Sequence, residues 1–148
     1  MQESQVYFIE LAIANKAKFV CDITEHFYNS NKTVCIYANS TKDATQIDQL
    51  LWTWKQDSFV PHAMTSAQNN EPIVIDTGQQ SIPEKDVLIL FDPLDPKVFS
   101  NYAYIIDFAE IYDTQKLQAS RKRYKDARNL EQYKLEFIKL GAFLNLKF

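Results

Sequence analysis

The chain has 148 residues, of which 46% are hydrophobic and 14% aromatic, so it can fold as one globular domain that buries about two-thirds of its unfolded surface. Its 16 lysine and arginine residues are outnumbered by 19 aspartate and glutamate residues. The resulting net charge of -3 argues against a protein that covers nucleic acid with a wide basic surface, because such a surface needs many uncompensated phosphate contacts.

The counts of glycine and cysteine exclude further classes of protein. Gly78 and Gly141 are the only glycines, too few for a P-loop or a dinucleotide-binding fingerprint. Cys21 and Cys35 stand alone, without a CxxC pair, so we expect buried thiols in a reducing cytosol and neither a disulfide nor a metal site. The sequence shows no signal-peptide pattern and no apolar run of membrane-spanning length. These features predict a cytoplasmic protein without membrane contact.

Hydrophobic periodicity predicts strands that alternate with helices along the chain. The predicted strands, rich in β-branched and apolar residues, are 5–9, 33–38, 72–76, 86–91 and 102–107. The predicted helices are 15–29 with Asn15 as its cap, one that starts at Ser40 or Thr41, a short turn after 92–96, and a long one that starts near Asp113 or Thr114. Residues 56–62 and 64–71 are expected to be connecting segments.

The C-terminal residues carry a further helical pattern. Tyr133, Phe137 and Leu140 recur at helical spacing, and Gly141 is a typical helix stop signal. We therefore predict a single domain over residues 1–148 with a helical C-terminal extension over 129–148. Its class is α/β, a three-layer, Rossmann-like domain with a mainly parallel five-stranded sheet flanked by helices and without a nucleotide fingerprint.

One basic segment stands out in this acidic chain. Residues 116–128 hold six cations and one acid, Asp126. On a helix, Arg121, Tyr124 and Arg128 fall on one stripe with Leu117, and Lys125 lies one turn beyond Arg121. Such a stripe suits an acidic partner that also carries an aromatic ring or a free carboxylate. The alternative, which charge alone favours, is a solvated helix face whose tyrosine packs into the core.

Aspartates at the ends of predicted strands allow a different hypothesis. Asp76, Asp92 and Asp107 each follow an apolar run, and in doubly wound folds ligands bind beyond the carboxyl ends of strands. A small Mg²⁺-dependent nucleotide or phosphate enzyme is therefore the alternative function. The absence of a phosphate-binding loop favours turn and cap roles for these acids, and His26 and His62 lie in no catalytic or metal-binding motif. The sequence thus predicts no catalytic residue, metal or cofactor.

Two aromatic residues mark a second candidate surface. Trp52 lies near the end of a predicted helix and Phe59 in the connector that follows it. Aromatic side chains of this kind are enriched at protein interfaces. Rings that turn inward explain the same pattern equally well.

Several blocks of the sequence resemble the chi subunit family of bacterial DNA polymerase III. They agree with that family in order, spacing and total length across nearly the whole chain. The matching blocks are 51–52, 57–62, 72–75, 86–89, 107–108 and 123–125. The Ser-Phe-Val-Pro-His block at 58–62 is the most specific. The resemblance implies a non-catalytic accessory subunit of the replicative holoenzyme.

The resemblance also implies the partners and their sites. The family's chi subunit pairs with the psi subunit, which tethers it to the clamp loader, and binds the acidic, phenylalanine-ending C-terminal tail of the single-stranded-DNA-binding protein. The residues assigned to the tail site are Arg121, Tyr124, Lys125, Lys116 and, from helical spacing alone, Arg128. The residues assigned to the psi interface are Trp52, Phe59 and Val60. Little or no direct nucleic-acid binding is expected, although direct binding of single-stranded DNA by the basic helix is a third hypothesis.

Overall fold

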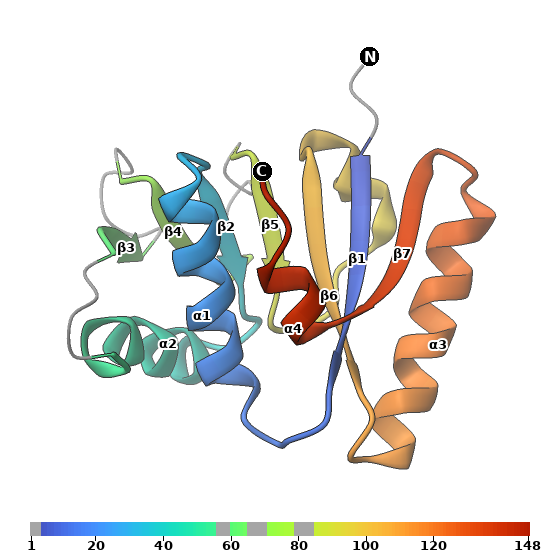
Figure 1. Ribbon diagram of the computed structural model, residues 1–148, viewed down its shortest axis with the longest axis horizontal. Coiled ribbons are helices and arrows are strands. Elements are labelled where there is room, and N and C mark those ends of the chain that lie inside the picture. Colours follow the sequence, from blue (N-terminus) through green and yellow to red (C-terminus); the bar gives the residue numbers. More distant parts are fainter. Residues whose placement is uncertain (1–3, 56–59, 65–70, 79–84) are drawn as a thin grey trace.

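A parallel β-sheet forms the centre of the computed structural model, which describes residues 4–55, 60–64, 71–78 and 85–148 (Figure 1). Within these residues the sheet has seven strands in the order β3-β4-β2-β5-β6-β1-β7, and neighbouring strands are parallel. The strands are β1 (Ser4–Leu11), β2 (Val34–Tyr37), β3 (His62–Met64), β4 (Ile73–Asp76), β5 (Val87–Leu90), β6 (Tyr104–Glu110) and β7 (Tyr133–Lys139).

Helices cover both faces of this sheet. The helices are α1 (Lys16–Asn29), α2 (Thr41–Thr53), the 3-10 helix η1 (Pro96–Asn101), α3 (Thr114–Asn129) and α4 (Leu140–Leu144). Side chains of a strand alternate between faces, so Ile9 joins a core cluster with α1, α2 and α4, whereas Phe8 joins a cluster with η1 and α3. The predicted single α/β domain, with a parallel sheet between two layers of helices, is therefore confirmed.

The number of strands and the C-terminal segment differ from the prediction. The predicted sheet lacked two strands: β3, which lies where connecting segments were expected, and β7, which lies where a helix was expected. Tyr133, Leu135 and Phe137 alternate with charged residues, and this period of two is satisfied when β7 pairs with β1 in the register Phe8↔Phe137. Gly141 stops no helix, because it lies inside the short α4.

Side-chain caps mark the starts of two of the predicted helices, α2 and α3. Ser40 precedes α2, and its hydroxyl accepts a hydrogen bond from the Asp43 backbone nitrogen at 3.1 Å. Asp113 precedes α3, and its carboxylate accepts from the backbone nitrogens of Gln115 and Lys116. Asn15 precedes α1 as predicted but forms no side-chain cap bond. The Asp113 cap begins α3 at Thr114, after the three residues that follow β6.

Both cysteines lie in the interior, as the sequence predicted. Cys21 and Cys35 are free thiols with no exposed surface. Burial in apolar surroundings raises the pKa of each thiol to about 12, so both behave as small hydrophobic side chains. Among the described residues, none of the helices combines the length and apolar character that crossing a membrane requires.

Candidate functional site

Helix α3 has a buried side that fixes the orientation of its basic residues. Ser120 and Ala127 are buried against the sheet, and Tyr124 is half-buried. The Tyr124 ring meets Phe8 of β1 edge-on, with 5.2 Å between ring centroids. The tyrosine therefore packs partly into the core, as one of the two sequence interpretations expected, and still presents part of its ring to solvent.

Three of the predicted cations lie together beside this ring. Arg121, Lys125 and Arg128 are exposed. If Arg121 is position i of α3, then Tyr124 is at i+3, Lys125 at i+4 and Arg128 at i+7, and these positions form one side of a helix. We call these four residues the basic stripe. A row of guanidinium and ammonium groups beside a partly exposed aromatic ring can bind carboxylates and an apolar side chain at once.

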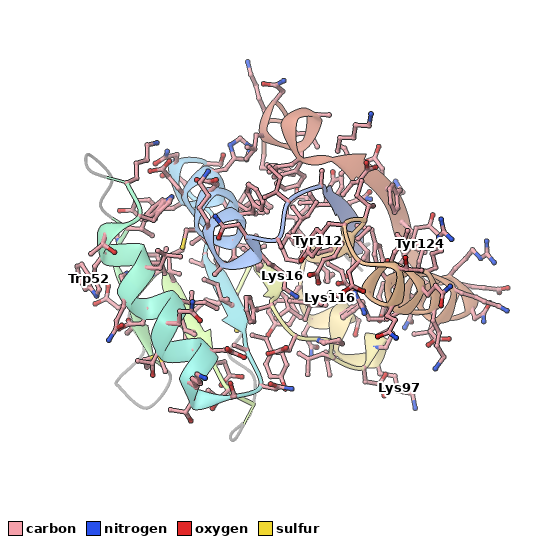
Figure 2. All side chains as sticks on the ribbon, turned by 90° about the horizontal axis from the view of Figure 1, so that it is seen from below. Lys16, Trp52, Lys97, Tyr112, Lys116 and Tyr124 are labelled. Carbon is pink, nitrogen blue, oxygen red and sulfur yellow. The ribbon has the colours of Figure 1, made fainter. Side chains whose placement is uncertain are left out.

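Lys116 does not belong to the basic stripe. It lies one turn before Ser120 and three turns before Ala127, so it follows the buried side of α3. Its Nζ is 3.5 Å from the Glu110 carboxylate and 5.6 Å from the centre of the Tyr112 ring. Figure 2 shows Lys116 beside Lys16 and Tyr112, over the carboxyl ends of the strands. Helical spacing alone already separates Lys116 from Arg121.

Arg123 and Asp107 form a buried ion pair that the sequence analysis did not identify. The Arg123 Nε is 2.8 Å from Asp107 Oδ2, and its Nη2 donates to Asp107 Oδ1 at 3.1 Å and to the Phe108 carbonyl at 3.2 Å. Asp107 is 4% exposed. The sequence signal that could have identified Arg123 is its position on the same side of the helix as Ser120 and Ala127. The carboxylate considered as a Mg²⁺ ligand is thus the counter-ion of an arginine.

A cleft of about 340 Å³ opens at the carboxyl ends of β5 and β6. Inside it the Glu110 carboxylate, 6% exposed, accepts hydrogen bonds from Lys16 at 3.0 Å and from the Tyr112 hydroxyl. Burial alone would raise the pKa of Glu110, but these bonds and the charges of Lys16 and Lys116 lower the pKa below its usual value. The cleft therefore holds a network in which the lysines are already paired with a carboxylate.

Two of the three strand-end aspartates, Asp92 and Asp107, have structural partners. Asp92 accepts from the Asn39 backbone nitrogen at 2.8 Å, and Asp107 pairs with Arg123. Asp76 is buried at the end of β4, and among the described residues its Oδ2 has no hydrogen-bond partner. Within residues 4–55, 60–64, 71–78 and 85–148, no three His, Cys, Asp or Glu side chains lie close enough together to hold a metal ion. Asp92 and Asp107 are thus occupied by structural contacts.

Both histidines hydrogen-bond to backbone carbonyl groups. The His26 Nε2 lies 2.8 Å from the Leu146 carbonyl oxygen. The His62 Nδ1 lies 2.6 Å from the Val60 carbonyl oxygen, and its Nε2 lies 3.1 Å from that of Asp48. Each imidazole therefore joins separate segments of the chain.

The second candidate surface centres on Trp52 of α2. Its side chain is 55% exposed and its ring lies 4.5 Å from that of His62. Val60, in contrast, is 1% exposed and packs in the core, so the assignment of Val60 to an interface is corrected: it supports the surface from within. Phe59 lies outside the described residues. Trp52 and Tyr124 lie at opposite ends of the molecule (Figure 2).

The same fold occurs in DEAD-box proteins. The chain is similar to the C-terminal domain of the DEAD-box protein Dbp5, with a TM-score of 0.62, 13% identity and coverage of 95% of this chain and 92% of that one. A DEAD-box protein from Methanococcus jannaschii gives a TM-score of 0.54 at 9% identity, over 93% of this chain and 41% of that one. These similarities define the class, an α/β domain built on a parallel sheet, and they concern the fold alone.

Sequence comparison identifies the family. The profile of the family described as DNA polymerase III chi subunit, HolC, matches residues 1–135. DNA polymerase III subunit chi of Haemophilus influenzae is 31% identical over 114 residues, which cover 75% of this chain and 78% of that protein. The Escherichia coli chi subunit is 30% identical, over 75% and 77% of the two chains. The chain belongs to the DNA polymerase III chi subunit family, a family of replication accessory subunits.

Proposed function

We propose that the chain is a non-catalytic adaptor that connects the clamp loader to single-stranded DNA coated by the single-stranded-DNA-binding protein. The basic stripe binds the acidic C-terminal tail of that protein, and the surface around Trp52 binds the psi subunit, which leads to the clamp loader. The main support is the basic stripe itself, a row of exposed cations beside the half-buried Tyr124 in a protein with a net charge of -3.

The chemistry of the basic stripe favours a short peptide over nucleic acid. Exposed ion pairs contribute about 0–1 kcal/mol each, so cations alone give weak binding. A terminal phenylalanine adds an apolar ring that packs beside Tyr124, and its carboxylate accepts two parallel hydrogen bonds from a guanidinium group such as that of Arg121. We expect a dissociation constant near one micromolar that rises with salt, since the exposed charges are screened.

A calorimetric titration tests the proposed tail site. A short acidic peptide that ends in Pro-Phe is expected to bind the full chain with a stoichiometry of one. The same peptide without its last phenylalanine, and the wild-type peptide with the Arg121→Ala/Tyr124→Ala variant, are expected to give no measurable heat of binding.

The Trp52→Ala variant is the matched control, because it removes an exposed aromatic ring at the other end of the molecule. It should bind the peptide as tightly as the wild type does. Unchanged binding by the Arg121→Ala/Tyr124→Ala variant would refute the assignment of the site to α3, and absence of binding by the wild-type chain would refute the function.

A further inference from the structure

The edge of the sheet next to the basic stripe is open. In the described part of the chain β7 is the terminal strand of the sheet and pairs only with β1. One row of its backbone N–H and C=O groups therefore faces away from the sheet, and such a row can pair with an extended peptide. Both views place α3 at this end of the sheet, beside β7 (Figures 1 and 2).

An exposed phenylalanine marks the same edge. Phe137 of β7 is 49% exposed and is more exposed than Leu135 and Ile138 of the same strand. It is aligned with Phe8 of β1, and aligned residues of parallel strands point to the same face of the sheet. Phe8 packs against Tyr124 of α3 at 5.2 Å. Phe137 and the ring of the basic stripe therefore flank the same residue from two sides.

The charges of β7 favour an acidic occupant. Tyr133, Leu135, Phe137 and Lys139 alternate onto the face that α3 covers, and this row contains no acid. The one acid of β7, Glu136, is aligned with Tyr7 and so points to the opposite face. There burial, and after it the charge of Glu136, raises the pKa of Tyr7. The stripe residues Arg121, Lys125 and Arg128 add positive charge on the α3 side.

The spacing of the cations also fits an extended chain. Arg121 and Lys125 are four residues apart on the helix, a rise of about 6 Å. Alternate side chains of a strand are about 6.6 Å apart. Every second side chain of a peptide strand beside β7 would therefore lie opposite a successive turn of α3.

We infer that the acidic peptide binds as an eighth strand along the open edge of β7, with its terminal phenylalanine ring packed on Phe137 as well as beside Tyr124 and its alternate acidic side chains directed to the basic stripe. This inference rests on the proposed function and adds to it the backbone geometry and the apolar anchor. Phe137 thereby becomes a further specificity-determining residue, because it distinguishes a peptide that carries an aromatic ring from other acidic chains.

A series of backbone-methylated peptides tests the added strand without altering the protein. Each peptide has the acidic sequence that ends in Pro-Phe and carries one N-methyl group on a different residue, which blocks a backbone hydrogen bond and leaves the side chains intact. Affinity measured by calorimetry should alternate along the series. Methylation of nitrogens that face β7 should weaken binding at least tenfold, and methylation of the nitrogens between them should have little effect.

Substitution of Phe137 tests the anchor. Phe137→Thr keeps a residue that is favourable in strands and is expected to weaken binding of the unmethylated peptide at least tenfold. Ile13→Thr, which removes another exposed apolar side chain, 65% exposed, should leave binding unchanged. Hydrogen exchange on the wild-type chain should show slower exchange of β7 amides when the peptide is bound.

The outcomes separate the inference from the function on which it rests. If the wild-type chain binds the peptide and Arg121→Ala weakens it, but affinity does not alternate with methylation and β7 amides exchange at the same rate, the added strand is refuted and the proposed function stands. If affinity alternates tenfold along the methylated series but Phe137→Thr binds the unmethylated peptide as the wild type does, Phe137 is refuted as the anchor. If no peptide binds to the wild-type chain, the proposed function itself fails.

Discussion

Two arginines two positions apart on α3 have different roles. Arg121 is exposed on the basic stripe, whereas Arg123 is the partner of the buried Asp107 carboxylate. The difference follows from the helical period, because two residues along a helix is a rotation of about 200°. Charge alone treats these residues as equivalent, and only the buried side of the helix separates a binding residue from a structural one.

This difference gives a paired prediction for stability and binding. Arg123→Ala leaves Asp107 buried without its counter-ion and should lower the free energy of unfolding by about 3 kcal/mol, the low end for a broken buried pair because Arg123 is partly exposed. Arg121→Ala should change it by less than about 0.5 kcal/mol. Urea unfolding measures both.

In peptide binding the larger effect should come from Arg121→Ala, the variant with the smaller loss of stability. Arg121→Ala is expected to weaken binding of the acidic peptide. Arg123→Ala, assayed at a temperature where it is folded, should bind the peptide nearly as tightly as the wild type does. Equal loss of stability in the two variants would contradict the assigned roles.

Glu110 links stability to pH. Its pKa in the folded protein lies below the ordinary value of 4.5, so the folded state binds fewer protons than the unfolded state as the pH falls through this range. The contribution of Glu110 to stability is complete above about 4.5 and is lost as the pH falls through the lower folded pKa. We therefore expect the urea midpoint of the wild type to decrease steeply on acidification, and that of Glu110→Gln to decrease less.

Measurement of urea midpoints between about pH 6 and pH 3 checks this expectation. Glu110→Gln should be the less stable protein at neutral pH, because Lys16 and Lys116 lose their carboxylate partner. Parallel pH profiles for the two proteins would show that Glu110 does not contribute to acid sensitivity.

At the scale of elements, local signals were sufficient for the helices and the central strands. Ser40 and Asp113 are capping residues by type, and they do cap α2 and α3. The apolar runs at β2, β4 and β5 are long enough to mark strands buried on both faces. These features depend on a few consecutive residues, which explains why the sequence alone predicts them.

Strand β7 could not be predicted in this way. Tyr133 and Phe137 are four residues apart, so they satisfy a helical period as well as a strand period, and Leu135 between them is apolar. What decides the structure is the pairing of β7 with β1, more than a hundred residues earlier in the chain. The three-residue β3 likewise depends on pairing with β4. A local sequence pattern carries no information about such long-range pairing.

Part of the candidate site could likewise be predicted from the sequence, and part of it could not. The basic stripe follows from helical spacing and was therefore predictable, and the departure of Lys116 from it follows from the same geometry. The Arg123–Asp107 pair and the position of Phe137 beside Phe8 depend on how α3 and β7 lie against β1 and β6. These contacts join distant segments and require the fold.

At the scale of the whole molecule, the sheet separates two surfaces. Trp52 contacts His62 at the start of β3, the first strand in the sheet order, and the basic stripe lies beside β7, the last. Six spacings between neighbouring strands of about 4.8 Å amount to roughly 29 Å. Because the Debye length is about 8 Å at physiological salt, charges at one surface have little influence on the other.

This separation leads to the measurement that tests the adaptor most directly. The acidic peptide that ends in Pro-Phe is titrated by calorimetry into the full chain alone and into its preformed complex with the psi subunit. We predict the same stoichiometry of one and dissociation constants that agree within about twofold, since the two partners occupy opposite ends of the sheet. Loss of peptide binding in the psi complex, or failure of the chain to bind either partner, would contradict the account.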